Sequence, residues 1–268
     1  MSHIILTHRG FAIGLHLSAA GEYVSIVNPA HIKYSTANGS ANKTDKAAAL
    51  DIAKFAQLHK PKAWVAPSEH LRLLTSLERH RTDLIGDRAK IEARLKDPGL
   101  TPAVLRSWTE TRDYLSGKIV EVETEIKKLI DDHDDLKKMK RLLETIPGIG
   151  SDTAVRLLAE MPVIDQCRSA QSAAAFGGLS PKEYRSGTSV FKPTRISKSG
   201  NKNLRSCLYW PAISAMRHNP RIKQLTERMK QKGKCNMACI LAAMRKLIMI
   251  AYGILKSGKP LQAEAEIR

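Results

Sequence analysis

The chain has 268 residues, with 44 Lys and Arg against 26 Asp and Glu, so its formal net charge is +18. Because 43% of the residues are hydrophobic, the chain has enough apolar material for folded cores, which excludes a disordered basic tail. The excess of cations indicates a nucleic-acid partner. Four scattered cysteines exclude a disulfide framework, and no uninterrupted apolar run is long enough to span a membrane. We expect a soluble, intracellular protein with no membrane partner.

Residues 1–67 are predicted to form part of an α/β domain. A helix is expected over residues 13–20, followed by a β-branched strand over 23–27 that ends at Asn28-Pro29. A second helix is expected to open at Thr44-Asp45 and to continue to about Leu58. Since an isolated pair of strands is only marginally stable in water, the rest of the sheet is either missing or contributed by another chain.

Residues 68–138 are predicted to form a coiled-coil helical arm. Apolar positions recur at spacings of three and four from Leu105 to Leu136, and a weaker series precedes them. The turn-forming residues 97–102 divide the two series, which favours an antiparallel helical hairpin. Such an arm either joins two domains or pairs with a second copy, and the pattern alone does not decide between these roles.

Residues 139–268 are predicted to form an all-α domain. Two helices flank a turn that contains Gly148 and Gly150, which is typical of a helix-hairpin-helix whose backbone N–H groups contact a phosphate. The alternative is a plain αα-hairpin in which Gly148 ends the first helix. Two further amphipathic helices are expected, one starting at Asn219-Pro220 and one running from Met237 to Leu255.

One segment of this domain gathers positive charge around a serine. No carboxylate lies between Tyr184 and Arg221, although the two signs usually alternate on a solvated surface. The segment is therefore interpreted as a phosphate-binding site, with Ser186 as candidate nucleophile and hydrogen-bond donor. The candidate nucleic-acid-binding cations are Lys182, Arg185, Lys192, Arg195, Lys198, Lys202 and Arg205.

An ordered series of motifs between about residue 15 and residue 260 resembles the transposases of the bacterial insertion-sequence family one-ten, which also includes the Piv-type DNA invertases. The motifs are Val24-Ser25-Ile26-Val27-Asn28-Pro29-Ala30, Lys43-Thr44-Asp45-Lys46-Ala47, Ile146-Pro147-Gly148-Ile149-Gly150, Phe176-Gly177-Gly178-Leu179-Ser180-Pro181, Ser186-Gly187, Arg195-Ile196-Ser197-Lys198-Ser199-Gly200-Asn201 and Leu204-Arg205.

The resemblance implies an α+β, mainly α protein in three parts. It implies an RNase H-like (RuvC-like) domain in which four acidic residues hold Mg²⁺, a coiled-coil arm, and a C-terminal domain whose serine links covalently to DNA. Ser186 matches that serine, and Asp45 matches one of the metal-binding acids. The implied partners are double-stranded DNA, a bridging guide RNA, and further transposase subunits in a homo-oligomer or hetero-oligomer. The implied location is the bacterial cytoplasm, at the nucleoid.

The acidic site departs from the family pattern. The acid expected three residues after Asp45 is replaced by Ala48, and residues 1–21 contain no Asp or Glu. Asp51 does not substitute, because six residues place it about 120° around the helix. A single carboxylate cannot hold the two metals that phosphoryl transfer usually needs. We therefore expect an N-terminally truncated, catalytically impaired transposase.

Three alternatives to this expectation stay open. In the first, the chain is an active recombinase whose acidic half comes from an upstream frame or from an intact partner joined through the arm. In the second, it is a non-catalytic nucleic-acid-binding regulator of the intact transposase. In the third, it is a site-specific DNA invertase.

Overall fold

The computed structural model describes most of the chain and divides it into two compact units, Met1–Ala66 and Pro67–Arg268. The residues described are 4–6, 11–27, 32, 35, 44–161, 167, 169–186 and 190–261, and the side chains of residues 4–6, 183–186 and 190–194 are not among them. Each unit is considered by itself.

The first unit contains a parallel strand pair, as expected for an α/β segment. Strands β1 and β2 pair in parallel, with Ile4 opposite Val24, and α1 connects them. The next helix begins at Asp45, where the Thr44 hydroxyl accepts a hydrogen bond from the Ala47 amide at 3.2 Å. The predicted strand and both predicted helices of this unit are thereby confirmed. The elements are β1 (Ile4–Leu6), α1 (Phe11–Ala19), β2 (Val24–Ile26) and α3 (Asp45–His59).

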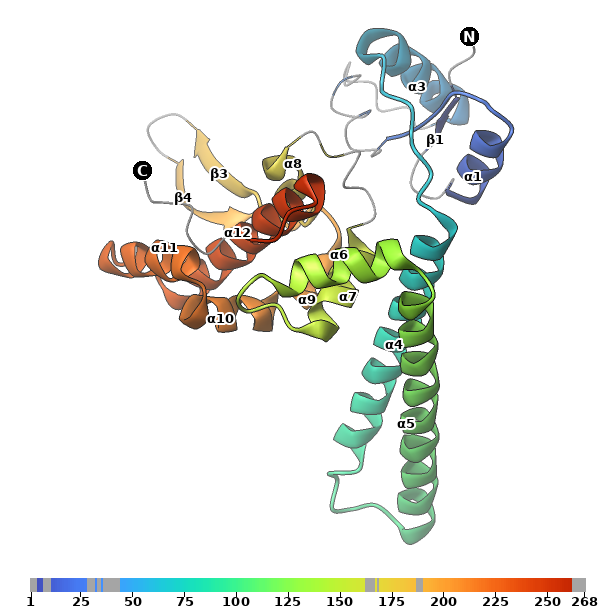
Figure 1. The fold of residues 1–268 in the computed structure, drawn as a ribbon, viewed down its shortest axis with the longest axis vertical. Coiled ribbons are helices and arrows are strands. Elements are labelled where there is room, and N and C mark those ends of the chain that lie inside the picture. Colours follow the sequence, from blue (N-terminus) through green and yellow to red (C-terminus); the bar gives the residue numbers. More distant parts are fainter. Residues whose placement is uncertain are drawn as a thin grey trace. The chain divides into compact units, whose positions relative to one another are not determined.

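The second unit begins with the predicted helical hairpin. Helix α4 (Glu69–Arg94) and helix α5 (Pro102–Asp131) run side by side in opposite directions (Figure 1). The buried apolar side chains of α5 are Ile119, Val122, Ile126 and Ile130, so at this end of the hairpin the seam closes against α4 within the same chain. Farther along α5, Leu105 is 46% exposed.

The base of the arm is held to the rest of the unit by Arg81. This residue interrupts the apolar series of α4. Its guanidinium donates hydrogen bonds to Glu123 on α5 at 2.9 Å and to Asp152 in the first turn of α7 (Ser151–Glu160). Its third partner, Glu78, is buried, and burial raises the pKa of that carboxyl despite the opposing charge of Arg81. The polar interruption of the seam therefore fixes the arm at a defined position on the helical core.

In the described residues of the C-terminal part, seven helices pack around an apolar core. The central one, α12, buries one face and ends where Gly258 adopts a left-handed conformation with φ of 64°. The predicted helix start at Asn219-Pro220 is confirmed, because the Asn219 side chain accepts a hydrogen bond from the Ile222 amide at 3.3 Å. The helices are α6 (Asp134–Glu144), α7 (Ser151–Glu160), α8 (Ala170–Phe176), α9 (Lys202–Cys207), α10 (Tyr209–His218), α11 (Pro220–Gln231) and α12 (Asn236–Ser257).

Helix α12 is long and apolar enough to cross a membrane by length and composition alone. However, half of its most apolar 18-residue window is buried inside the unit, where Leu247 and Ile248 are fully covered by neighbouring helices. Core helices of folded domains commonly have this composition. We interpret α12 as the core helix of this unit.

The prediction of an entirely helical C-terminal domain is wrong for residues 181–196. Strand β3 (Pro181–Ser186) and strand β4 (Val190–Ile196) pair in antiparallel fashion. Tyr184, Val190 and Phe191 are residue types that favour strands, and Gly187 stands between the two runs. The sequence analysis interpreted this segment through its charge and so missed a short hairpin with these propensities.

The arm provides a matched pair of positions for testing where its seam packs. We predict that Val122→Asp lowers the free energy of unfolding by about 3 kcal/mol or more, because it buries an unpaired carboxylate in the hairpin. Val120→Asp, on the same helix but 61% exposed, is expected to change stability by less than about 0.5 kcal/mol. Thermal and urea unfolding measure both effects. If sedimentation shows that Val120→Asp changes the mass of the particle, the exposed face of the arm contacts a second copy instead.

Candidate nucleic-acid interface

The segments that precede and follow the basic hairpin of β3 and β4 are joined to each other by backbone hydrogen bonds. The Asn201 amide donates to the Phe176 carbonyl at 2.7 Å, and the Lys198 amide donates to the Gly178 carbonyl at 3.1 Å. A Cβ atom on Gly200 would lie 2.2 Å from the Phe176 carbonyl oxygen, and Gly200 has φ of 154°, so this position requires glycine. The Gly-Gly and Ser-Gly-Asn motifs are therefore needed for close backbone packing beneath the hairpin.

Like charges face each other across the start of the hairpin. Lys182 and Arg195 occupy directly paired positions of β3 and β4, and both are exposed. Directly opposed cations destabilise a strand pair. Lys198 follows β4 with an exposed side chain and φ of 54°, which is uncommon for a residue other than glycine. Lys202 is exposed in the first turn of α9, where a cation is not favoured by the helix dipole.

The candidate nucleophile lies at the far end of the same strand. Ser186 is the last residue of β3 and pairs with Val190. The register changes by one residue along the hairpin, since Lys182 pairs with Arg195 but Tyr184 pairs with Lys192. The extra residues of β4 include Pro193, a residue type that strands tolerate at such bulges. The side chains of Ser186, Arg185 and Lys192 lie outside the described residues.

Two arginines hold the loops beneath the hairpin, and one of them was not singled out from the sequence. Arg205, a predicted nucleic-acid contact, donates from Nη1 to the Gly177 carbonyl at 3.0 Å and is half-buried. Arg245 of α12 donates to the Leu179 carbonyl at 3.3 Å and to the Ser180 hydroxyl at 3.2 Å. A lone arginine within the apolar sequence of α12 was the available signal for this second anchor.

A buried carboxylate joins the arm to the loop that follows the hairpin. Glu160, at the end of α7, accepts two hydrogen bonds of 3.0 Å from Arg79 of α4. It also accepts from the side-chain amides of Asn201 at 2.7 Å and Asn203 at 3.1 Å. Burial by itself would raise the pKa of Glu160, but these hydrogen bonds and the charge of Arg79 outweigh burial and lower the pKa below 4.5. Glu160 therefore remains ionised and keeps three segments in contact.

The glycine turn between α6 and α7 combines one packed and one exposed position. Gly148 has φ of 101°, and a Cβ there would lie 2.7 Å from the Cβ of Ala215 on α10, so this glycine is required by packing. Gly150 is the exposed N-cap residue of α7. The first turn of α7 already holds Asp152, whose carboxylate pairs with Arg81. Two helices flank the glycine turn, as predicted, and both the helix-hairpin-helix assignment and phosphate contact at the turn stay predictions.

The acidic residue of the family pattern that this chain retains, Asp45, lies in the first unit. Asp45 is the exposed first residue of α3, and Ala48 follows one turn later. Throughout the described part of the chain, no three His, Cys, Asp or Glu side chains form a group that could hold a metal ion. The described residues therefore do not fit a site for Mg²⁺.

Comparison with protein families finds two matching models. One, described as the transposase IS116/IS110/IS902 family, matches residues 140–227. The other, described as a transposase and named for the DEDD transposases of IS110 elements, matches residues 7–98. Together they cover the segment that contains Asp45 and the segment that contains Ser186.

The chain also resembles individual proteins along most of its length. It is 34% identical over 244 residues to the pilin gene-inverting protein of Moraxella bovis, a match that covers 88% of this chain and 74% of the relative. It is 23% identical over 252 residues to the transposase for IS1111A of Coxiella burnetii, covering 81% and 67% of the two chains. The transposase for IS1328 of Yersinia enterocolitica is 25% identical over 224 residues, covering 72% and 64%.

The lowered pKa of Glu160 predicts a pH-dependent contribution to stability. A depressed carboxyl pKa stabilises the folded state above the unfolded value of about 4.5, and this contribution is lost as the pH falls through the folded value. Glu160→Gln should therefore lower the free energy of unfolding by about 1–3 kcal/mol at pH 7, and the difference from wild type should shrink below about pH 4.5.

Urea unfolding at a series of pH values measures this difference. Because Glu78 is present in both proteins, its own titration cancels from the comparison. Glu125→Gln, an exposed position on α5, is the control and should unfold as wild type does at every pH. A difference between Glu160→Gln and wild type that stays constant down to pH 3 would contradict the assignment.

Proposed function

The chain belongs to the IS116/IS110/IS902 transposase family, and on this premise we propose that its C-terminal unit holds a DNA phosphate beside Ser186 for covalent attack. Its general activity is that of a transposase or recombinase of an insertion element of this family. The observation that carries the proposal is the opposed pair Lys182 and Arg195 on the hairpin that ends at Ser186. Strand β3 contains one acidic residue, Glu183, and no Asp or Glu follows from residue 185 to residue 220.

The proposed chemistry is a phosphoryl transfer to a serine. The Ser186 hydroxyl oxygen forms a bond to phosphorus, and the bond from phosphorus to a sugar oxygen of the DNA breaks. The serine proton is lost to a base, and the departing sugar oxygen takes up a proton. Lys182, Arg195 and Lys198 lie at the other end of the hairpin from Ser186, and we assign them to neighbouring phosphates of the same DNA strand.

Mg²⁺ would stabilise the phosphoryl and leaving-group charges in a member with all four acids. In this chain the donor set is incomplete, because Asp45 is followed by Ala48 where the family pattern has a second acid. We infer that strand cleavage requires acidic residues from another polypeptide, such as an intact relative in a mixed oligomer. The RNase H-like assignment of the first unit rests on the family resemblance and agrees with its parallel strand pair.

The proposed partners follow from the same charge. A duplex DNA substrate and a bridging guide RNA both present phosphates to the basic hairpin, and the net charge of +18 favours association with either. The proposed site of action is the bacterial cytoplasm, at the nucleoid. If no partner donates acidic residues, the chain acts instead as a non-catalytic regulator that occupies element ends or guide RNA.

A second candidate function is site-specific inversion of a DNA segment. The relative from Moraxella bovis is named for pilin gene inversion, and it is more similar to this chain than the transposase from Coxiella burnetii is, at 34% against 23% identity. The residues proposed for phosphate binding and attack are the same under both candidates. Mapping the DNA junctions formed in cells distinguishes inversion from insertion.

We predict salt-sensitive binding to nucleic acid. Affinity for duplex DNA should fall by ~10³-fold or more between about 50 and 200 mM salt. Replacing Arg195, Lys198 and Lys202 by Gln should lower the slope of log affinity against log salt by about two to three, because each lost phosphate contact removes about 0.9. Fluorescence anisotropy measures both quantities.

The control for this titration is an arm variant with the same loss of charge. It replaces Lys96, Lys127 and Lys128, all exposed on the helical hairpin, by Gln. It should keep nearly the wild-type slope. Salt-independent binding by the wild-type protein, or an equal effect of both triple variants, would count against the hairpin as the phosphate site.

We also predict that the isolated chain neither cleaves nor joins DNA with Mg²⁺ or Mn²⁺ and a suitable guide RNA, because it lacks the second acid of the pattern. An intact relative is then added that carries all four acids, with its own nucleophilic serine replaced by Ala. Strand transfer should appear in this mixture. That activity should disappear when this chain carries Ser186→Ala. Cleavage by the isolated chain that depends on Ser186 would refute the incomplete-site argument.

A further inference from the structure

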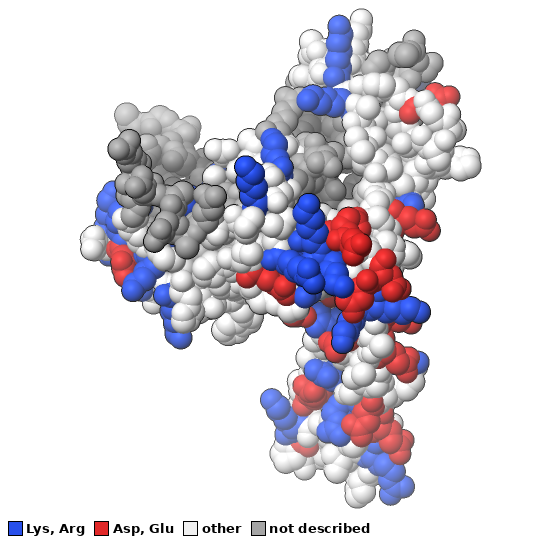
Figure 2. Space-filling model, in the orientation of Figure 1, with Lys and Arg blue, Asp and Glu red and all other residues white. Residues whose placement is uncertain are grey.

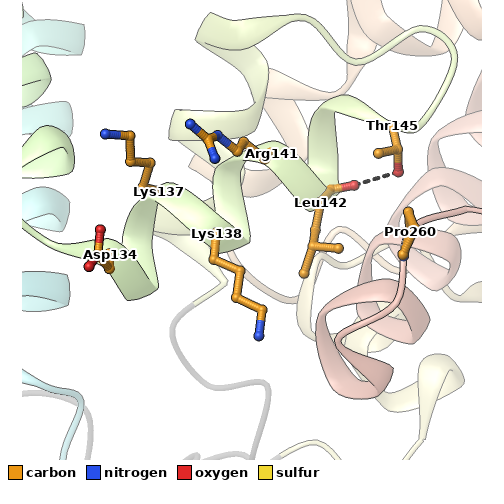
Figure 3. Close-up of a pocket in the computed structure, with 7 residues that line it drawn as sticks. All are labelled: Asp134, Lys137, Lys138, Arg141, Leu142, Thr145 and Pro260. Carbon is orange, nitrogen blue, oxygen red and sulfur yellow. Dashed lines mark hydrogen bonds between the residues drawn. The ribbon is translucent and has the colours of Figure 1, made fainter.

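Helix α6 borders a hollow that the proposed chemistry does not use. Its volume is about 320 Å³, and it opens to the surface between α6 and the segment that follows α12 (Figure 3). The lining residues are Asp134, Lys137, Lys138, Arg141, Leu142, Thr145 and Pro260.

The wall of the hollow is fixed by hydrogen bonds. The Thr145 hydroxyl donates to the Leu142 carbonyl at 2.6 Å and accepts from the Leu261 amide at 3.1 Å. This one hydroxyl ties the end of α6 to the segment after α12. The hollow is therefore a built feature of the unit and not merely a gap between mobile side chains.

The lining of the hollow has more positive than negative side chains. Lys137, Lys138 and Arg141 take part in no ion pair within the described part of the chain, whereas their neighbour Lys140 pairs with Glu144 at 2.7 Å. Asp134 is the one carboxylate among the lining residues. Figure 2 shows Lys and Arg side chains over the part of the molecule where α6 lies in Figure 1, with Asp and Glu side chains next to them.

The helix dipole explains only part of this arrangement. A cation in the last turn of a helix interacts favourably with the dipole, which accounts for Arg141. Lys137 and Lys138 lie in the first half of α6 and gain nothing from the C-terminal end. Figure 3 shows Lys137 and Arg141 pointing to one side of α6 and Lys138 to the other, so the cations border the hollow from two sides.

We propose that this hollow binds the phosphodiester backbone of a nucleic acid, as a second contact surface of the same unit. The proposal rests on the proposed function in one respect, namely that the chain binds nucleic acid. A concave site with a surplus of two positive charges matches phosphate groups. Neither the glycine turn at Gly148 nor the hairpin at Ser186 contributes to its lining.

Helix α12 relates the two basic surfaces to each other. Arg245 of α12 holds the loop at the start of β3, and α12 ends at Ser257, just before Pro260 of the hollow. Twelve helical residues separate these points by about 18 Å. That is the span of about five phosphates along one strand of duplex DNA, at 3.4 Å each. This separation exceeds the size of one phosphate ion, so a single ligand at both surfaces must be an extended polyanion.

The test replaces Lys137, Lys138 and Arg141 by Gln in the full chain. Fluorescence anisotropy with labelled duplex DNA and labelled duplex RNA should show affinity lowered about tenfold or more, and a salt slope lowered by about two. The arm variant at Lys96, Lys127 and Lys128 should change affinity less than about twofold. Loss with both probes, or with one alone, supports the proposal and identifies the backbone that the hollow prefers.

Two additional measurements keep the test decisive. If the triple variant unfolds, Lys138→Gln with Arg141→Gln, both at exposed positions, replaces it and should give about two thirds of the change in slope. Inorganic phosphate and pyrophosphate, titrated into the complex of the wild-type chain with labelled duplex, test whether the hollow is a site for small anions. If they displace the duplex at concentrations that leave the salt slope of the hairpin variant unchanged, the proposal that the hollow binds a nucleic-acid backbone is overturned.

The outcomes separate this inference from the proposed function. Wild-type affinities and slopes in the α6 variant, alongside a weakened hairpin variant, would overturn the inference and leave the proposed function standing. An equal loss in the α6 and arm variants would overturn it as well, because total charge would then explain both. If the wild-type chain binds neither duplex at low salt, the proposed function fails and the second surface fails with it.

Discussion

The arrangement of the second unit depends on the ionised, buried carboxylate of Glu160. A carboxylate in that position is costly to bury unless each of its oxygens is hydrogen-bonded and its charge is balanced. Arg79 supplies the balancing charge from the arm, and Asn201 and Asn203 supply the remaining donors. Moving any of these segments would leave a buried charge without partners. The arm, the end of α7 and the loop after the basic hairpin are therefore coupled.

The loops beneath the hairpin extend this constraint to the proposed phosphate site. The Asn201 amide also donates to the Phe176 carbonyl. Because Gly200 has no side chain, the backbones of the two loops can come into direct contact. Arg205 and Arg245 hold the opposite loop through the Gly177 and Leu179 carbonyls. Some cations of the basic segment thus stabilise the fold, whereas Arg195 and Lys198 are exposed at the hairpin.

The division of the chain into two units matters for its chemistry. The candidate nucleophile and the retained acid belong to different units, so an active arrangement depends on how separate bodies, within one chain or between chains, are brought together. A polyanion that contacts both the hairpin and the hollow beside α6 would orient the second unit with respect to its substrate. Contacts with phosphates away from the reacting one would then hold Ser186 in position for attack.

The sequence by itself determined most of the longer helices, the arm hairpin and the family, because these depend on local periodicity, capping residues such as Asn219, and ordered motifs. It also located the basic segment, since charge is visible without coordinates. It did not predict α8, α9 and α10, and the predicted seam continued to Leu136 across the break at His133 that separates α5 from α6. It did not reveal the strand pair at 181–196, whose propensities were masked by charge, or the role of Glu160, which lies 81 residues from Arg79 and 41 from Asn201. Whether a cation binds a partner or a carbonyl of its own chain is decided by tertiary contacts. Only the folded structure could therefore assign Arg205 and Arg245 to the scaffold and leave Lys198 exposed.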